Sequence, residues 1–296
     1  MGMETAIPMQ GADRSAAMPA AALPAATSPA EVWQRLLAEA AAIAAAEPLL
    51  KPFVTRAILA HDGLAPALAH LLADRLDDGM LGQERLASLA AETMAASADI
   101  PAAAAADLAA ILERDPAAGR LSTPFLYFKG FHALTWHRIG HALWIGGRRD
   151  IAAYLQSRTA ERFGIDIHPA AMIGRRVLID HGTGVVVGET AVVGDDVSIL
   201  QGVTLGGTGK ESGDRHPKIR DGVLLGTGAK VLGNIEIGRG AKVGAGSVVL
   251  DDVPPCATVA GVPARIVGWC PGAAPALSMD QTLPLERDRD RDPPPL

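Results

Sequence analysis

From residue 167 to residue 249 an aliphatic residue recurs almost every six positions, and this period constrains the fold more than any other feature. The anchors are Ile167, Ile173, Ile179, Val187, Val193, Ile199, Leu205, Ile219, Leu225, Val231, Ile237, Val243 and Val249. A period of six matches neither an α-helix nor a flat amphipathic strand. It suits a β-helix, in which each short strand sends one aliphatic side chain inward and a tight corner follows. Three steps of six make one triangular coil, so anchors stack on anchors.

The period is interrupted twice, and the interruptions mark where the coil opens. One insertion is small and lies within 182–188; the other, at 206–217, is polar and rich in glycine. A long loop that leaves a rigid solenoid is usually functional.

Four regions follow from composition and pattern. Residues 1–29 are rich in Ala, Pro and Met, and we expect a disordered extension. Residues 30–163 have helical spacing, opened by an N-cap at Ser28 with Glu31 three residues on, and predict an all-α domain. Residues 164–269 form the β-helix, which makes the fold class α+β. Residues 270–296 alternate charges and end in prolines, which predicts a flexible tail or a docking segment. The expected helices are 49–60, 64–76, 84–98, 102–112, 125–144 and 149–163.

Charge and cysteine content exclude several classes of protein. The net charge of −6 gives no basic footprint, so we expect no nucleic-acid partner. Cys256 and Cys270 do not make a disulfide framework, which fits a reducing, cytoplasmic compartment. No apolar run reaches eighteen residues, so we expect no membrane span.

Polar residues concentrate near the first insertion. His181 comes two residues after the anchor Ile179 and so points away from the column, and Asp166 precedes the anchor Ile167 on the coil below. A carboxylate that accepts a hydrogen bond from one imidazole nitrogen leaves the other nitrogen free to act as a base. From spacing alone, a surface histidine that caps a corner is an equally good interpretation.

Several segments closely resemble bacterial serine O-acetyltransferases, a hexapeptide-repeat family. In the β-helix they are Asp166-Ile-His-Pro-Ala-Ala, Asp180-His-Gly-Thr-Gly184, Val203-Thr-Leu-Gly-Gly-Thr-Gly-Lys210, Gly213-Asp-Arg-His-Pro-Lys218 and Gly261-Val-Pro-Ala-Arg265. In the helical domain they are Lys129-Gly-Phe-His-Ala133 and Arg138-Ile-Gly-His-Ala-Leu-Trp144. The resemblance spans roughly residues 32–268.

This resemblance implies a left-handed parallel β-helix behind a helical domain that mediates oligomerisation, with homotrimers pairing into a hexamer. It implies transfer of acetyl from acetyl-CoA to L-serine, giving O-acetyl-L-serine and CoA, the first step of cysteine biosynthesis. His181 is then the general base, Asp166 orients it, and the hydroxyl attacks the thioester directly without an acyl-enzyme.

The resemblance also assigns the ligands of a zwitterionic substrate. Asp115 and Asp180 are expected to bind the ammonium group, and Arg215 and His216 the carboxylate. By residue type alone, Asp115 before a proline is equally a turn initiator, and Arg215 a solvated loop charge. Feedback inhibition by L-cysteine is expected at the same residues, and Glu189 either supports the site or is a solvated corner residue.

CoA is expected along the outer wall of the β-helix between neighbouring subunits, and no metal is expected. The positions assigned to CoA are Gly206, Gly207, Thr208, Thr227, Lys242 and Ala245. Glycines permit close backbone approach, and Lys242 offers a cation for phosphate.

The C-terminus departs from the family. Members often end in an isoleucine that enters the active site of O-acetylserine sulfhydrylase, whereas this chain ends Pro-Pro-Pro-Leu296. That enzyme is an expected partner only if leucine can replace isoleucine. Three other hypotheses stay open: another acetyl acceptor such as a sugar or homoserine, a zinc hydratase using His168, His181 and His216, and a non-catalytic trimerising scaffold.

Overall fold

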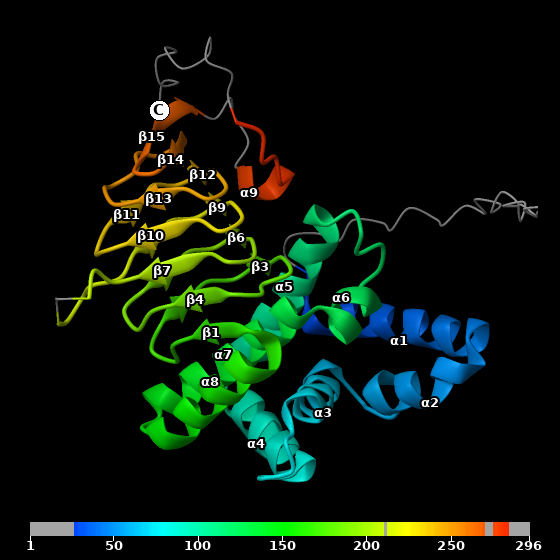
Figure 1. The fold of residues 1–296 in the computed structure, drawn as a ribbon. Coiled ribbons are helices and arrows are strands. Elements are labelled where there is room, and N and C mark those ends of the chain that lie inside the picture. Colours follow the sequence, from blue (N-terminus) through cyan, green and yellow to red (C-terminus); the bar gives the residue numbers. More distant parts are fainter. Residues whose placement is uncertain (1–26, 210–211, 270–274, 284–296) are drawn as a thin grey trace, which may run out of the picture.

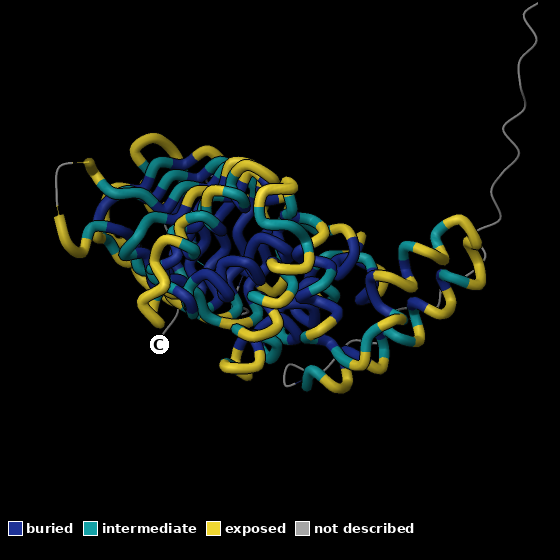
Figure 2. Tube along the Cα trace, turned by 90° about the horizontal axis from the view of Figure 1, so that it is seen from below, coloured by how far each residue is buried: buried dark blue, intermediate teal, exposed yellow. Residues whose placement is uncertain are grey.

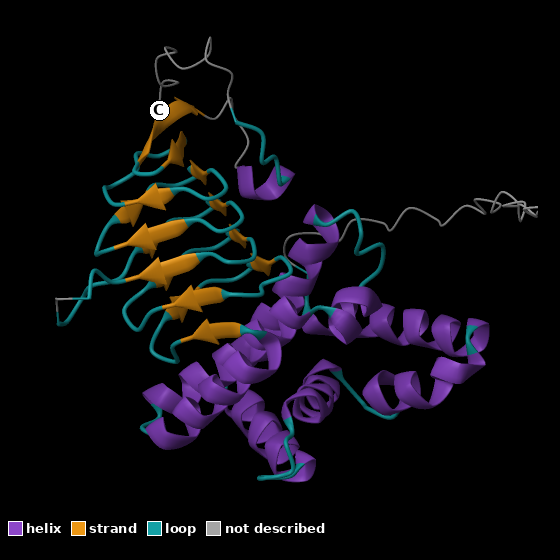
Figure 3. Ribbon diagram, viewed as in Figure 1, coloured by secondary structure: helices purple, strands orange, loops and turns teal. Residues whose placement is uncertain are grey.

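The computed structural model describes residues 27–209, 212–269 and 275–283. A helical part occupies one end of the molecule and a β-helix the other (Figures 1 and 3). The expected disordered extension lies almost wholly outside the described residues, as do 270–274 and 284–296 of the expected tail.

The helical part contains most of the helices that the apolar spacing predicts. They are α1 (Pro29–Ala46), η1 (Pro48–Leu50), α2 (Lys51–Val54), η2 (Thr55–Leu59), α3 (Leu64–Leu76), α4 (Gln83–Ala96), α5 (Asp99–Arg114), α6 (Ser122–Tyr127), α7 (Lys129–Ile145) and α8 (Arg149–Phe163). The cap expected at the start of α1 is present: Glu31 N–H donates to the Ser28 hydroxyl, and Ser28 N–H donates to the Glu31 carboxylate. Two orphan helix donors are thereby satisfied.

One expected helix is divided. The spacing predicts a helix over 125–144, but Phe128 is extended (φ −86°, ψ 109°) and separates α6 from α7. The break changes the direction of the chain, and α7 then lies beneath the first coil of the β-helix (Figure 1).

Three parallel sheets form the walls of the β-helix. Sheet A has strand order β1-β4-β7-β10-β13, sheet B has β11-β8-β5-β2, and sheet C has β15-β14-β12-β9-β6-β3. The strands are β1 (Ile165–Ile167), β2 (Met172–Ile173), β3 (Leu178–Ile179), β4 (Val185–Val187), β5 (Val192–Val193), β6 (Ser198–Ile199), β7 (Thr204–Gly206), β8 (Lys218–Ile219), β9 (Leu224–Leu225), β10 (Lys230–Leu232), β11 (Glu236–Ile237), β12 (Lys242–Val243), β13 (Val248–Val249), β14 (Ala257–Gly261) and β15 (Ala264–Trp269).

The anchors of the six-residue repeat stack as predicted. In sheet C, Ile179 pairs with Ile199, Ile199 with Leu225, and Leu225 with Val243. Sheets A and B repeat the pattern from Ile167 and Ile173. One apolar core continues from this column into the helices (Figure 2). Among the strands that the structure describes, only β15 runs antiparallel, returning along β14 at the last rung of sheet C.

A buried ion pair joins the helical part to the β-helix. Arg138 on α7 donates to the Asp107 carboxylate on α5 at 2.8 Å and to the carbonyl oxygens of Ile173 and Gly174. The other Asp107 oxygen accepts the Val177 N–H at 2.9 Å. Because Arg138 and Asp107 each bind the other and also the backbone of the first coil, α5, α7 and that coil are fixed relative to one another.

Part of the expected flexible tail differs from the expectation. Within 275–283, α9 (Pro275–Ser278) lies beside sheet C, and Ala276 is fully buried with Leu200 and Leu224. The Ser198 hydroxyl donates to the Ala276 carbonyl at 2.9 Å. A short apolar group, buried at Ala276, therefore contributes to fixing this segment.

Within the described residues, no single helix has the length and apolarity needed to cross a membrane. The pair α4 and α5, bent by 98° at their junction, reaches that length and composition only when the two are taken together.

Candidate active site

His181 lies at the corner between β3 and β4, where sheet C turns into sheet A. Its backbone is in the left-handed region (φ 53°), and three-quarters of its side chain is exposed. Nε2 lies 3.8 Å from Oδ1 of Asp180, which precedes it. The imidazole is therefore open to solvent and is placed beside a carboxylate. We name Asp115, Asp180 and His181 the base corner.

Asp115 faces Asp180 across the junction of the two parts. It ends α5, where its Oδ1 accepts the Ala117 N–H at 2.8 Å, so the turn interpretation describes its local role. Burial raises the pKa of Asp180; His181 opposes that rise, and the neighbouring Asp115 carboxylate adds to it. Two carboxylates that disfavour each other's charge make a site that a bound cation would relieve.

Asp166 is not hydrogen-bonded to His181 in the described structure. It lies on β1, and its Oδ1 accepts the side-chain amide of Gln156 on α8 at 2.7 Å. The carboxylate nearest to the imidazole is instead that of Asp180. Sequence spacing missed Gln156 because nothing in the repeat predicts which helix lies beside the first strand.

His216 lies at a different corner, where the long loop after β7 in sheet A returns to β8 in sheet B. The Thr190 N–H donates to its Nδ1 at 3.2 Å, while the Thr190 hydroxyl accepts the N–H groups of Arg215 and His216. With Nδ1 occupied as an acceptor, the neutral ring carries its proton on Nε2 and presents a donor. Burial, followed by the positive charge of Arg215, lowers the pKa of His216, so the ring is neutral at pH 7.

Arg215 is paired with Glu189, which lies at the corner between β4 and β5, just after the first insertion. Its guanidinium donates to the Glu189 carboxylate at 2.7 Å, and this hydrogen bond lowers the pKa of Glu189. Glu189 therefore has a specific partner and orients Arg215. We name Glu189, Thr190, Arg215 and His216 the loop corner. Thr190 was not predicted, although it is the next residue after Glu189 at the same corner.

The residues expected to bind CoA divide between the same two corners. Thr227 and Ala245 follow β9 and β12 at the corner above His181, whereas Gly206, Gly207 and Thr208 begin the long loop beside His216. Glycines with positive φ stack rung on rung above the base corner; they are Gly184, Gly202, Gly228 and Gly246. Without side chains there, the backbone of that corner is open to close approach.

Lys242 is engaged elsewhere. Its ammonium group is buried and donates to the carbonyl oxygens of Thr282 at 2.6 Å and Asp280 at 3.3 Å. The residue expected to meet a CoA phosphate therefore binds the segment 275–283 in this structure. Sequence reasoning could not find this contact because the segment has no periodic pattern.

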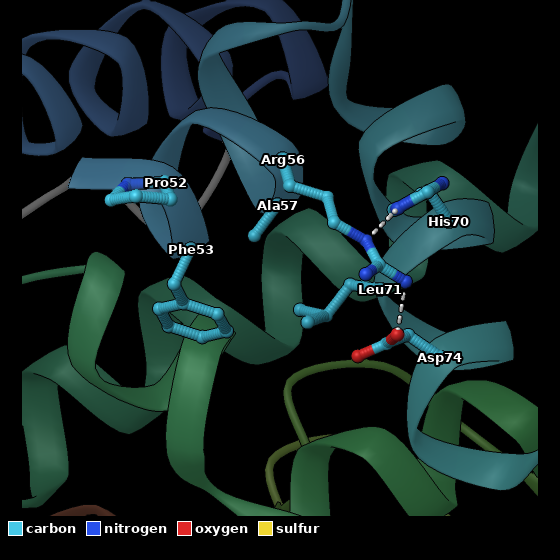
Figure 4. Close-up of a pocket in the computed structure, with 7 residues that line it drawn as sticks. All are labelled: Pro52, Phe53, Arg56, Ala57, His70, Leu71 and Asp74. Carbon is cyan, nitrogen blue, oxygen red and sulfur yellow. Dashed lines mark hydrogen bonds and ion pairs between the residues drawn. The ribbon is translucent and has the colours of Figure 1, made fainter. Parts of the chain in front are cut away.

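Some hollows in the structure lie outside the predicted site. A depression of about 250 Å³ in the helical part (Figure 4) is lined by Pro52, Phe53, Arg56, Ala57, His70, Leu71 and Asp74. Its polar groups are already paired, since Arg56 donates to both His70 and Asp74. A cleft of about 700 Å³ between α5, α7 and β2 contains none of the predicted residues. Across the described ranges, no three His, Cys, Asp or Glu side chains are grouped to hold a metal ion.

Comparison with known proteins matches both parts of the chain. The family model described as serine acetyltransferase, N-terminal, matches residues 32–135, and the bacterial transferase hexapeptide model matches residues 216–251. The serine acetyltransferase of Salmonella typhimurium is 56% identical over 250 residues, which cover 84% of this chain and 92% of that protein.

Solved structures agree with the sequence relatives. A serine acetyltransferase in complex with cysteine has a TM-score of 0.84 and 52% identity, covering 86% of this chain and 99% of that one. One in complex with CoA has a TM-score of 0.78 and 51% identity, covering 81% and 100%. The Neisseria gonorrhoeae enzyme in complex with serine has a TM-score of 0.77 and 50% identity, covering 79% and 96%. On this similarity across both parts, the chain belongs to the serine acetyltransferase family.

Proposed function

We propose that the chain transfers acetyl from acetyl-CoA to the hydroxyl of L-serine, with His181 as general base, in the first step of cysteine biosynthesis. The observation that carries the proposal is that two carboxylates lie at the base corner, whereas hydrogen-bond donors, one of them cationic, lie at the loop corner. Asp115 and Asp180 suit an ammonium group, while Arg215 and the Nε2–H of His216 suit a carboxylate. A free amino acid carries both groups, whereas a sugar needs neither.

The proposed chemistry is a direct transfer. His181 takes the proton of the serine hydroxyl as the oxygen attacks the thioester carbonyl, the C–S bond breaks, and the CoA thiolate receives the proton from the imidazolium. A positioned base of this kind contributes ~10²–10⁴-fold in rate. Asp166 is proposed to orient the ring through its second carboxylate oxygen, since Gln156 occupies the first.

The two corners are proposed to meet across neighbouring subunits. Within one chain they lie on different edges of a triangular solenoid, because one joins sheets C and A and the other joins sheets A and B. In a cyclic trimer the base corner of each copy faces the loop corner of the next, which is a heterologous contact that closes. Trimers then pair into a hexamer through the helical part.

The same arrangement accommodates the other expected ligands. CoA is proposed to lie in the groove between subunits. It would contact the stacked glycines above the base corner on one side and Gly206, Gly207 and Thr208 on the other. L-cysteine differs from serine only at the sulfur, so it is proposed to inhibit by binding the same charged residues; the solved relative in complex with cysteine supports this. The expected docking on O-acetylserine sulfhydrylase would use Leu296, which lies outside the residues that the structure describes.

The test is thiol release from acetyl-CoA in the presence of L-serine. Serine-dependent release should fall at least ~100-fold in His181→Ala. Thiol release with another acceptor but not with serine would reject serine as the substrate. No thiol release with any acceptor would favour the hypothesis of a non-catalytic trimerising scaffold.

A mixing experiment tests the shared site. His181→Ala and His216→Ala subunits, each inactive alone, are co-expressed with different tags and purified as mixed oligomers. Random assembly places an intact base corner opposite an intact loop corner at about a quarter of the interfaces, so about a quarter of the activity returns. A site contained within one chain predicts no recovery.

A further inference from the structure

The corner that carries His181 depends on its surroundings for its shape. A residue with a Cβ rarely adopts the left-handed backbone seen at His181 (φ 53°). Such conformations persist only where neighbouring structure determines them. The side chain itself contributes little, because three-quarters of it is exposed.

The strand that leads into this corner, β3, is paired within the β-helix on one side only. β3, which leads into the corner, is the first strand of sheet C and pairs with β6 above it. The Asp180 N–H donates to the Ile199 carbonyl of that upper rung at 2.8 Å. No coil lies below β3; the start of α7 occupies that place instead (Figure 1).

Gly130, in the first turn of α7, makes this contact possible. A Cβ at this position would lie 2.0 Å from the Ile179 carbonyl oxygen and 3.0 Å from its carbon. Both are backbone atoms of the residue before Asp180, so they cannot move aside as the end of a side chain can.

Lys129 holds the other side of the same corner. Its ammonium group donates to the hydroxyl of Thr183, two residues after His181. Adjacent residues of α7 therefore contact the residue before Asp180 and the second residue after His181.

We infer that Gly130 and Lys129 are positioning residues for His181, and that the first turn of α7 sets where the imidazole stands relative to the substrate. The inference rests on the proposed function. A methyl group on residue 130 would start 2.0 Å from the Ile179 carbonyl oxygen, so Ile179 and α7 must separate by more than 1 Å to reach ordinary contact. A displacement of about 1 Å at a reacting group already costs ~100-fold in rate.

The first experiment compares two substitutions in one helix. Gly130→Ala should lower kcat for serine acetylation ~100-fold and change the KM for acetyl-CoA little. Gly140→Ala is the matched control, since its Cβ would meet only Pro169 at 4.0 Å, an ordinary contact. Gly140→Ala should keep full activity. Equal kcat values in the two variants would overturn the inference.

The second experiment separates positioning from general damage. If Gly130→Ala acts by misplacing the base, then adding His181→Ala to it should cost only a few-fold more, whereas His181→Ala in the Gly140→Ala background should cost its full ~100-fold. If His181→Ala lowers kcat by the same ~100-fold in both backgrounds, the positioning role is refuted. An inactive wild type would instead reject the proposed function.

A milder pair covers the case in which Gly130→Ala does not fold. Lys129→Met and Thr183→Val each remove one partner of the same hydrogen bond. They should lower kcat by the same factor, and their combination should lower it no further. Independent effects, or no effect on kcat, would overturn the role of Lys129.

Discussion

His132 should make the stability of this protein fall between about pH 6.5 and pH 4. Its ring is buried on α7 between Phe131 and Phe163, and Nε2 donates to the Phe125 carbonyl at 2.7 Å. Burial lowers the pKa of His132 to about 4, against about 6.5 in the unfolded chain. The hydrogen bond to Phe125 opposes that shift without cancelling it.

The sign follows from which state binds more protons. Below about pH 6.5 the unfolded chain protonates this imidazole and the folded chain does not, so acid favours unfolding. The contribution of His132 to the free energy of unfolding is fully present above pH 6.5 and is lost as the pH falls toward 4. At about 1.4 kcal/mol per pH unit, the loss is about 2 kcal/mol by pH 5 and about 3.4 kcal/mol in all.

Urea denaturation followed by far-UV circular dichroism measures this loss. Wild type and His132→Gln are compared at pH 8 and at pH 5, at one protein concentration because the oligomer contributes to stability. Glutamine keeps a donor for the Phe125 carbonyl and does not titrate. The wild type should lose about 2 kcal/mol more than the variant on acidification. Equal losses in the two proteins would refute the linkage.

Two further predictions concern buried contacts. Asp107→Asn leaves the Arg138 guanidinium buried without its counter-ion and should lower the free energy of unfolding, measured by urea denaturation, by ~3–5 kcal/mol. Asp107→Leu combined with Arg138→Met should recover most of that stability. A double variant less stable than Asp107→Asn would contradict this. Lys242→Met removes the donor to the Thr282 carbonyl and should speed thermolysin cleavage within 275–283, with cleavage mapped by mass spectrometry; an unchanged rate would show that Ala276 alone holds the segment.

The repeat of six was predictable because its cause is local. Each anchor needs only to be aliphatic and to follow a corner, so the column from Ile179 to Val243 could be predicted before any contact was known. The cap at Ser28 is equally local. The break at Phe128 was not predictable, because it depends on where α7 must lie beneath the first coil.

The residues of the candidate site could be named from the sequence, but their positions relative to one another could not. The resemblance named His181, Asp115 and Arg215, but it did not say how they are arranged within one chain; the structure places His181 and Asp115 at one corner and Arg215 at another. The partners of these residues were missed because they come from other elements: Gln156 from α8 beside Asp166, and Lys129 from α7 beside Thr183. Helical spacing predicts which face of a helix is buried but not which corner of a solenoid it meets.

The strand that returns at the last rung of sheet C limits how these molecules can aggregate. A parallel coil ends in a row of unpaired backbone groups, which is a template for an identical coil from another molecule. Here the final strand is the antiparallel β15, its register against β14 shifts between Thr258 and Val259, and the exposed Arg265 lies on it. An irregular, charged edge is a poor template, and α7 covers β3 at the opposite end. End-to-end growth into a fibre is therefore disfavoured from both ends of this sheet.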